Sequence, residues 1–241
     1  LCDGLKFTGW HSGYPDARLV IAADSCREIP FEPNTLFFLS QFAAECNAIC
    51  PRSLLQQVVL RASQMGFKPL CSLEFEFSAF SQTLQELFES EFSSLKPMTP
   101  ANCGYSLLRS GTYAEFYHEL LSLCETMDMP LEGLHTEIGP GVLEAAIAYD
   151  SAVAAADKAI LFKTFTKIFA QRRGIMTTFM AKWDINQQGQ SGHTHISLTD
   201  NAGQPVFFDD TKEHNISDTM RHFMAGQQKL MPELLAMVAP N

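Results

Sequence analysis

Apolar and polar residues alternate strictly in CSLEFEFSAF, residues 71–80. This period of two predicts a β-strand with one apolar face and one polar face. The apolar face would carry Leu73, Phe75 and Phe77. Glu74 and Glu76 fall on the polar face with Ser78, and the two glutamates would lie about 7 Å apart along the strand. One face of this strand is therefore expected to pack on a core and the other to stay free.

The segment HTHISL, residues 193–198, repeats this pattern with histidines. A strand here places His193 and His195 on one face together with Ser197. Further strands are predicted at residues 17–24, at 144–149 and at 176–183.

A period of 3.6 residues predicts helices between these strands. The first covers residues 51–64, with Pro51 at its start and a stop at Gly66. The second runs from 112 to about 127 and is opened by a Thr112–Glu115 capping box. The third covers 152–173, capped by Ser151 and ended by Gly174, and the fourth covers 218–230 and ends near Pro232. Residues 28–35 read as a linker and 84–103 as irregular. This mixture of two-faced strands and helices predicts an α+β fold, a curved antiparallel sheet backed by helices.

Composition narrows the class of protein. The 241 residues are 46% hydrophobic and 18% charged, which suits one large core or two unequal domains. A net charge of -10 without a Lys/Arg cluster argues against nucleic-acid binding. There is no uninterrupted apolar run of membrane-spanning length and no signal-peptide pattern, so neither a membrane span nor secretion is expected. The chain begins with Leu1 rather than Met, which suggests a start within a longer protein.

Cysteine usage indicates a reducing compartment. The seven cysteines are odd in number, scattered, and contain no CxxC pair. They are expected to be reduced thiols of a cytoplasmic protein rather than disulfides or zinc ligands.

Glutamates and histidines with metal-binding chemistry recur along the chain. Glu137 and Glu144 flank a Gly139-Pro140-Gly141 turn, which can bring them close together. If the strands are neighbours, these two carboxylates converge with those of 71–80 and with a histidine, and the cluster would repel itself without cations. Oxygen-rich donors favour Mg²⁺ or Mn²⁺. Two such ions commonly clamp a transferring phosphoryl group.

Each motif alone also fits a solvated strand face or a loop charge. The order in which these motifs follow one another along the chain favours a metal site. The order of the motifs resembles that of the glutamine synthetase family. This order is ExE, then ExGPGxxE, then a long helix ending in RRG, then TFMAKW, and then a glycine-containing loop before HTHISL. The likeness extends from FTGW near the start to VAPN at the end.

The resemblance implies a fold and a set of roles. It implies a partial N-terminal β-grasp domain over residues 1–33 and an incomplete catalytic domain over 34–241. One metal, near the glutamate and the attacking amine, would be held by Glu76, Glu137 and Glu144; a second, bridging the ATP phosphates, by Glu74 and His193. Nucleotide and substrate contacts would come from His195, from Gly189 and from the preceding Gln188. Tyr105 would border the amine site.

Departures from the family pattern bear on the amine. Thr8 in FTGW stands where the family has an ammonium-handling Asp, and a neutral hydroxyl cannot attract or deprotonate NH₄⁺ as a carboxylate does. Gln188 replaces an Asn. The chain also stops at Asn241, before the family's arginine-bearing segment, so these 241 residues alone are expected to be inactive.

The resemblance therefore predicts an ATP-dependent ligase that joins an amine to the γ-carboxylate of glutamate through a γ-glutamyl phosphate. The acceptor would be ammonia or a small amine, with a γ-glutamyl-polyamine or γ-glutamyl-alkylamine ligase as the alternative. An inactive structural or regulatory relative and a metal-dependent hydrolase stay open as well. Family relatives also imply a homo-oligomer of stacked rings.

Overall fold

The computed structural model describes residues 13, 17–102 and 104–238. The chain forms two compact units. Unit 1 contains Leu1–Gln56 and Cys71–His195, and unit 2 contains Gln57–Leu70 and Ile196–Asn241. The domain boundary predicted at residue 33 stays a prediction. Thr8 lies outside the described residues.

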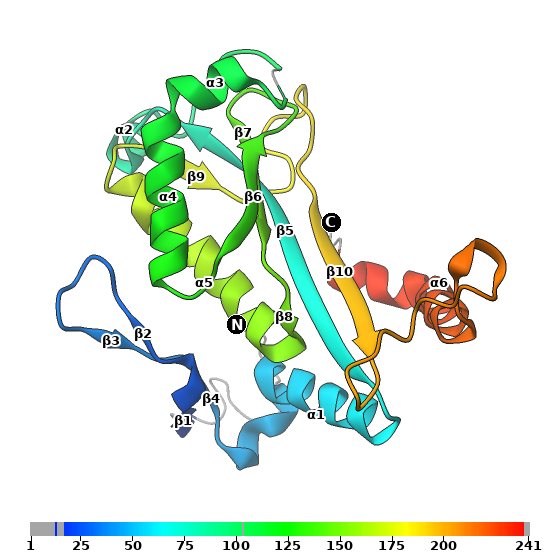
Figure 1. The fold of residues 1–241 in the computed structure, drawn as a ribbon. Helices are drawn as coiled ribbons and strands as arrows, with labels where there is room; N and C mark the ends of the chain where they lie inside the picture. Colours follow the sequence, from blue (N-terminus) through cyan, green and yellow to red (C-terminus); the bar gives the residue numbers. More distant parts are fainter. Residues whose placement is uncertain (1–12, 14–16, 103, 239–241) are drawn as a thin grey trace. The chain divides into compact units, whose positions relative to one another are not determined.

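The central sheet has the strand order β10-β5-β7-β6, as Figure 1 shows. Its strands are β5 (Lys68–Phe80), β6 (Leu131–Thr136), β7 (Val142–Ile147) and β10 (Gly192–Thr199). Two short strands, β8 (Asp150–Ser151) and β9 (Met176–Thr178), also pair with β5. The β5–β7 and β6–β7 pairs are antiparallel.

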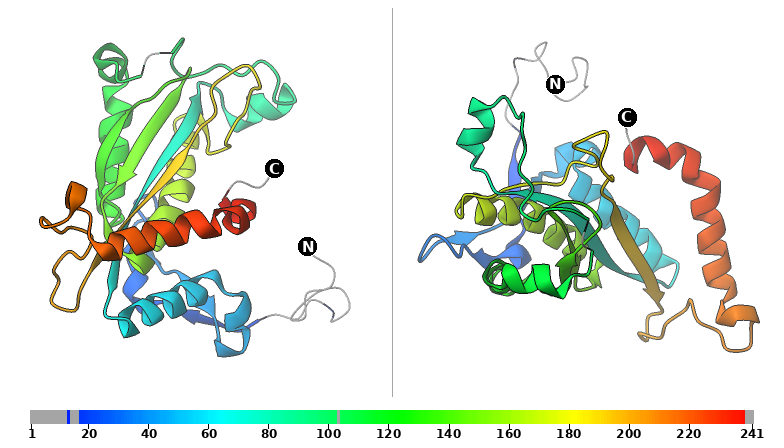
Figure 2. Two further views of the ribbon diagram at one scale, coloured as in Figure 1. Left: turned by 90° about the vertical axis from the view of Figure 1, so that its right-hand side faces the viewer. Right: turned by 90° about the horizontal axis from the view of Figure 1, so that it is seen from above.

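Helices of unit 1 cover one face of this sheet (Figures 1 and 2). They are α4 (Ala114–Thr126) and α5 (Ala152–Gln171), and the same unit contains two shorter helices, α2 (Leu84–Glu89) and α3 (Leu107–Thr112). Phe77 of β5, Leu120 of α4 and Phe162 of α5 are fully buried in the resulting core. Burial of these apolar side chains on one face leaves the acidic face of β5 turned away from the core.

Smaller elements complete the two units. Unit 1 also contains β1 (Leu19–Ile21) paired with β4 (Ser40–Phe42), β2 (Arg27–Glu28) paired with β3 (Leu36–Phe37), and the short helices η2 (Ala23–Ser25) and η3 (Ala44–Ile49). Helix α1 (Pro51–Gln64) crosses from unit 1 into unit 2, which also holds η4 (Glu213–Asn215) and α6 (Asp218–Val238). Within the described residues, none of the helices combines the length and the apolar character needed to cross a bilayer.

The α+β prediction and the helix at 51–64 are confirmed, the latter with both bounds correct. The strands at 71–80 and 193–198 are confirmed within β5 and β10, but on the predicted apolar face of β10 only Leu198 is buried. Gly66 follows α1 with a φ of 88°, which suits glycine at a helix end.

The predicted capping box at Thr112 is wrong. Thr112 ends α3, and its hydroxyl donates to the Leu108 carbonyl at 2.8 Å. Ser106 caps α3 instead, and α4 begins at Ala114 without a side-chain cap. The helix predicted from 112 to about 127 is nevertheless present as α4, and the separate short helix α3 precedes it.

Several element bounds also differ from prediction. Ser151 precedes α5 but makes no side-chain capping bond. The strand predicted at 176–183 is limited to β9, and the strand predicted from Glu144 begins at Val142. Helix α2 lies inside the segment predicted to be irregular. Helix α6 continues through Pro232 at the loss of one backbone donor, where an end was predicted.

Candidate metal and substrate site

Strand register brings the glutamates of unit 1 together. Glu76 of β5 lies directly opposite Glu144 of β7, and Glu144 lies directly opposite His135 of β6. Residues opposite each other in an antiparallel pair have their side chains on the same face, about 4.5–5.5 Å apart at Cβ. The free face of the sheet therefore gathers acidic groups from two neighbouring strands and a histidine from a third.

Both predicted histidines contact Glu74. His193 Nδ1 lies 2.9 Å from one carboxylate oxygen, and His195 Nε2 lies 3.2 Å from the other. Burial raises the pKa of Glu74, but hydrogen bonds from His193 and then His195 outweigh it, so the pKa lies below its ordinary value. Glu74 is therefore ionised at neutral pH and available as a ligand.

The Gly-Pro-Gly turn shapes the position of Glu137. The Glu137 amide donates to the Val142 carbonyl at 3.0 Å, which closes the turn. Gly139 and Gly141 have φ values of 128° and 69°, and a Cβ on Gly141 would collide with the Ala79 carbonyl oxygen. Only glycine suits such a position, so the turn can fold tightly against β5.

One oxygen of Glu137 is left without a protein partner. Its Oε1 accepts from the Ile138 amide at 2.9 Å. Its Oε2 is buried and has no hydrogen-bond partner among the described residues. A buried, unpaired carboxylate oxygen is costly, which indicates that a cation or a donor from outside the protein completes this position.

His135 was not among the predicted site residues. Its Nε2 lies 3.5 Å from Glu144 Oε2, and its Nδ1 lies 3.8 Å from Glu137 Oε2. Its ring is stacked on that of Tyr105, with centroids 4.7 Å apart and planes at 25°. The position two residues before Glu137 in a strand was the signal that could have found it.

Glu144 experiences the accumulated negative charge. Burial raises its pKa; His135 opposes this, and the charges of Glu74, Glu76 and Glu137 raise it further. Glu144 thus holds a proton more readily than an ordinary glutamate, and a cation that bound there would displace that proton into water.

Two overlapping groups have the donor spacing of a metal site. Ligand atoms of Glu74, Glu144 and His193 lie within 4.8 Å of one another, as do those of His135, Glu137 and Glu144. Carboxylate oxygens with a single imidazole suit Mg²⁺ or Mn²⁺. Together with the unpaired oxygen of Glu137, this donor set fits divalent cations.

Glu76 is turned toward the loop before β10. Its carboxylate accepts from the Ser191 amide at 3.0 Å and from the Ser191 hydroxyl. Glu76 therefore faces Glu144 in register but belongs to neither donor group described above.

The other predicted residues border this face in different ways. Gln188 and Gly189 are exposed in the loop between β9 and β10. A Cβ on Gly189 would lie 3.1 Å from the Ala181 carbonyl, so the loop backbone runs close to that segment. Tyr105 is 72% exposed, and its interaction with the negatively charged Glu137 carboxylate raises the pKa of its hydroxyl.

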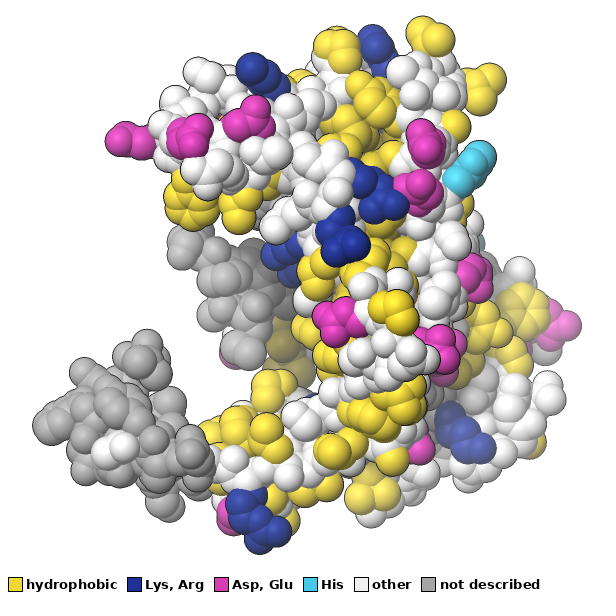
Figure 3. Space-filling model, turned by 90° about the vertical axis from the view of Figure 1, so that its left-hand side faces the viewer, with side chains coloured by type: hydrophobic (Ala, Val, Ile, Leu, Met, Phe, Trp, Pro, Cys, Tyr) yellow, Lys and Arg dark blue, Asp and Glu magenta, His cyan; other side chains and the backbone are white. Residues whose placement is uncertain are grey.

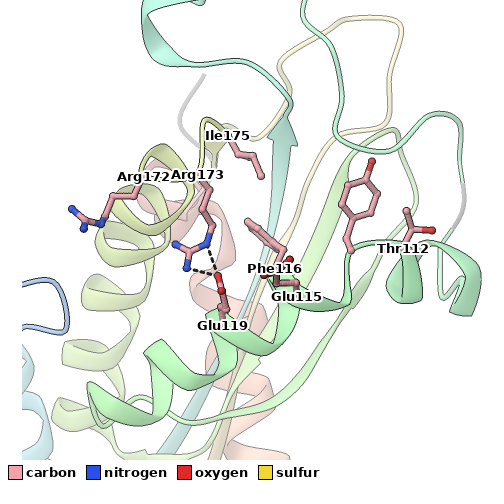
Figure 4. Close-up of a pocket in the computed structure, with 8 residues that line it drawn as sticks. Thr112, Glu115, Phe116, Glu119, Arg172, Arg173 and Ile175 are labelled. Atoms are coloured by element: carbon pink, nitrogen blue, oxygen red, sulfur yellow. Dashed lines mark hydrogen bonds and ion pairs between the residues drawn. The ribbon is translucent and has the colours of Figure 1, made fainter.

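A separate hollow of about 640 Å³ lies between α4 and the end of α5, shown in Figure 4. Two of the charges that line it are paired with each other, since Arg173 Nε donates to Glu119 Oε2 at 2.6 Å. On this side of the molecule, basic, acidic and hydrophobic side chains are interspersed (Figure 3). The concentration of carboxylates thus distinguishes the sheet face from this hollow.

Comparison with known proteins gives a consistent picture. Residues 48–241 match the family described as "Glutamine synthetase, catalytic domain". The chain is 41% identical to "Type-1 glutamine synthetase 2" of Dictyostelium discoideum, over 99% of this chain and 46% of that protein. It is 34% identical to "Glutamate--isopropylamine ligase" of Pseudomonas sp, over 100% of this chain and 53% of that protein.

The solved structure "Apo GmaS without ligand" is similar in fold, with a TM-score of 0.83. The match covers 94% of this chain and 53% of that one at 24% identity. The chain thus spans about half the length of the proteins that it matches.

Proposed function

The chain belongs to the glutamine synthetase family, and from this premise we propose that it supplies the metal-binding face of an ATP-dependent glutamate–amine ligase. Enzymes of this family use ATP and divalent metals. The observation that carries the proposal is the pair of overlapping donor groups that share Glu144.

The proposed reaction has two steps. The γ-carboxylate of glutamate attacks the γ-phosphorus of ATP, forming γ-glutamyl phosphate and releasing ADP. The ammonium group gives one proton to a base or to water, and the neutral nitrogen then attacks the acyl carbon. Phosphate leaves with the electrons of the C–O bond, and the nitrogen gives a second proton to water. Bound divalent cations would neutralise the charge that develops on the phosphoryl oxygens.

We assign the site residues according to their contacts. Glu74 and His193 would hold the cation at the ATP phosphates, with His195 directed to the nucleotide. Glu137 and Glu144, with Glu76 opposite Glu144, would hold the cation near the reacting carboxylate. The assigned substrate contacts are Gly189 and Gln188 for glutamate and Tyr105 for the amine.

The acceptor is proposed to be ammonia or a small alkylamine. Thr8 favours the alkylamine, because it lacks the negative charge that would attract ammonium. The names of the relatives support both acceptors as candidates, because one relative is named a glutamine synthetase and another is named a glutamate–isopropylamine ligase. We also propose, from family likeness, a cytoplasmic homo-oligomer of stacked rings.

The test is phosphate release by the full-length protein that carries these residues, with ATP, Mg²⁺, glutamate and one amine at a time. Ammonia, methylamine, isopropylamine, ethanolamine and putrescine would serve as acceptors. Glu137→Gln is expected to lower kcat/KM by about 100-fold or more, because it removes a charged group that acts on the transition state. Glu132→Gln is the matched control, since Glu132 is an exposed glutamate on the same strand. Release of phosphate from ATP without any requirement for glutamate and amine would refute the ligase assignment.

A further inference from the structure

Tyr105 is held in an unusual backbone conformation. Its φ is 55°, in the left-handed region that bulky residues rarely occupy. Its amide donates to the Thr136 carbonyl at 2.8 Å, and the next amide, of Ser106, donates to the Thr136 hydroxyl at 3.0 Å. Such conformations persist where the surroundings impose them, often at functional sites.

This anchoring fixes the Tyr105 ring against the residue beside Thr136. Thr136 lies between His135 and Glu137, so the two hydrogen bonds place the loop next to both. The Tyr105 and His135 rings stack at 4.7 Å, while the Tyr105 side chain stays largely exposed. A well-positioned aromatic pair therefore stands at the edge of the acidic face.

The stacked pair borders the unpaired oxygen of Glu137. That oxygen lies 3.8 Å from His135 Nδ1, and the Glu137 side chain is only 12% exposed. Aromatic faces beside a carboxylate form the arrangement that recognises organic ammonium groups, by cation–π attraction and charge together. The stacked rings add an apolar surface beside the carboxylates, and this surface suits the alkyl part of an amine, whereas a hard metal ion takes only the carboxylate oxygens.

We propose that His135 is a specificity-determining residue, whose imidazole, stacked on Tyr105 beside Glu137, forms the wall that limits the alkyl group of the acceptor amine. This rests on the proposed ligase function and names the residue that sets its substrate range. The ammonium nitrogen would contact Glu137 and the alkyl group would lie against the aromatic wall.

Two substitutions distinguish a His135 that limits the size of the amine from a His135 that binds a metal through its ring nitrogens. His135→Ala removes the ring, and His135→Phe keeps an aromatic ring without the nitrogens. In the full-length protein, His135→Ala is expected to raise kcat/KM for isopropylamine relative to ammonia by about 10-fold, the usual scale for one or two methylene-sized changes in a pocket. His135→Phe is expected to keep the parent preference. KM for glutamate should stay unchanged in both.

His118→Ala is the control, since His118 is an exposed histidine on α4. Loss of activity with every acceptor by one common factor, in both His135 variants, would overturn the proposal and indicate that the ring nitrogens hold a metal. An unchanged acceptor preference in His135→Ala would overturn it as well.

A binding measurement without turnover keeps this inference distinct from the ligase assignment. Side-chain ring resonances of His135 and Tyr105 are followed by NMR as isopropylammonium chloride is added, with and without Mg²⁺. Saturable shifts that are absent in Glu137→Gln support the amine subsite, even if no phosphate is released in the activity assay. Absence of any saturable shift in the parent would refute the subsite, whatever the outcome of that assay.

Discussion

Lys158 shows how a single buried charge constrains the fold. It lies on α5 with 8% of its side chain exposed, and its Nζ donates to Asp150 Oδ2 at 2.7 Å. A buried ammonium without a partner is strongly unfavourable, so Asp150 of β8 fixes how the start of α5 packs.

The pH dependence of this pair follows from the pKa of Asp150. Burial raises that pKa, but the hydrogen bond from Lys158 and the Ser151 amide lower it more, to below its ordinary value. A depressed folded pKa gives stability that is present above the unfolded pKa of about 3.9. That stability is lost as the pH falls through the folded value.

Asp150→Asn is therefore expected to destabilise the protein at pH 7 by about 1–2 kcal/mol, less than for a fully buried pair because 38% of the Asp150 side chain is exposed. The difference from the parent should shrink as the pH falls below about 4, because the unfolded carboxylate is protonated first and the folded one follows at lower pH. Urea denaturation at several pH values measures the destabilisation at pH 7 and its decrease at low pH. Asp210→Asn, at an exposed aspartate, should show neither effect. A destabilisation that stays constant down to pH 3 would contradict the assignment.

At the scale of elements, α2 depends on its capping box. Glu86 N donates to Thr83 Oγ1 at 3.2 Å, and Thr83 N donates to Glu86 Oε2 at 2.7 Å. The helix is only six residues long, so its own hydrogen bonds stabilise it little. It nevertheless buries Leu87 completely.

Thr83→Ala should lower the free energy of unfolding by about 1 kcal/mol, the usual cost of losing an N-cap hydroxyl. Thr83→Ser keeps the hydroxyl and should keep most of the stability. Chemical denaturation measures both variants. Equal losses in the two variants would indicate that the threonine methyl group, and not the cap, is responsible.

The elements also show what the sequence can and cannot predict. Strand β5 was predictable because its apolar side chains pack on the core while Glu74 and Glu76 lie half-buried on the opposite face, so the alternation in its sequence is regular. His135 was missed because the register of β6 shifts between Leu131 and Gly133, which disguises the alternation leading to it. The Tyr105–His135 stack joins residues 30 positions apart through a loop conformation that local patterns do not specify.

The helix ends illustrate the same limit. Pro51 and Gly66 predicted α1 correctly because both act through their own backbone. Thr112 and Ser151 failed as caps, since a hydroxyl can bond to several groups and tertiary packing decides which.

For the whole molecule, cation binding and stability should be linked. The chain carries a net charge of -10, and several of its glutamates converge on one sheet face. Their mutual repulsion stores unfavourable free energy in the metal-free state, which the raised pKa of Glu144 reflects after the effect of burial. A bound divalent cation would remove that repulsion and stabilise only the folded chain.

The expected stabilisation by a bound cation follows from mass action. Mg²⁺ or Mn²⁺ at a hundredfold excess over Kd stabilises the folded state by about 2.7 kcal/mol. For a chain of this length that corresponds to a rise in Tm of roughly 5–10 °C. Differential scanning fluorimetry with and without a chelator measures it.

Glu144→Gln should separate the effect of carboxylate repulsion on stability from the effect of cation binding. Without metal, the variant is expected to be as stable as the parent or more stable, because a repelling carboxylate has been removed. With metal, it should gain less than the parent, because Glu144 belongs to both donor groups. Glu132→Gln removes the same formal charge at an exposed site and should retain the full response to metal. If both variants lost the response equally, cations would be acting on the net charge of the chain and not at a site; a loss confined to Glu144→Gln places the cation on the sheet face.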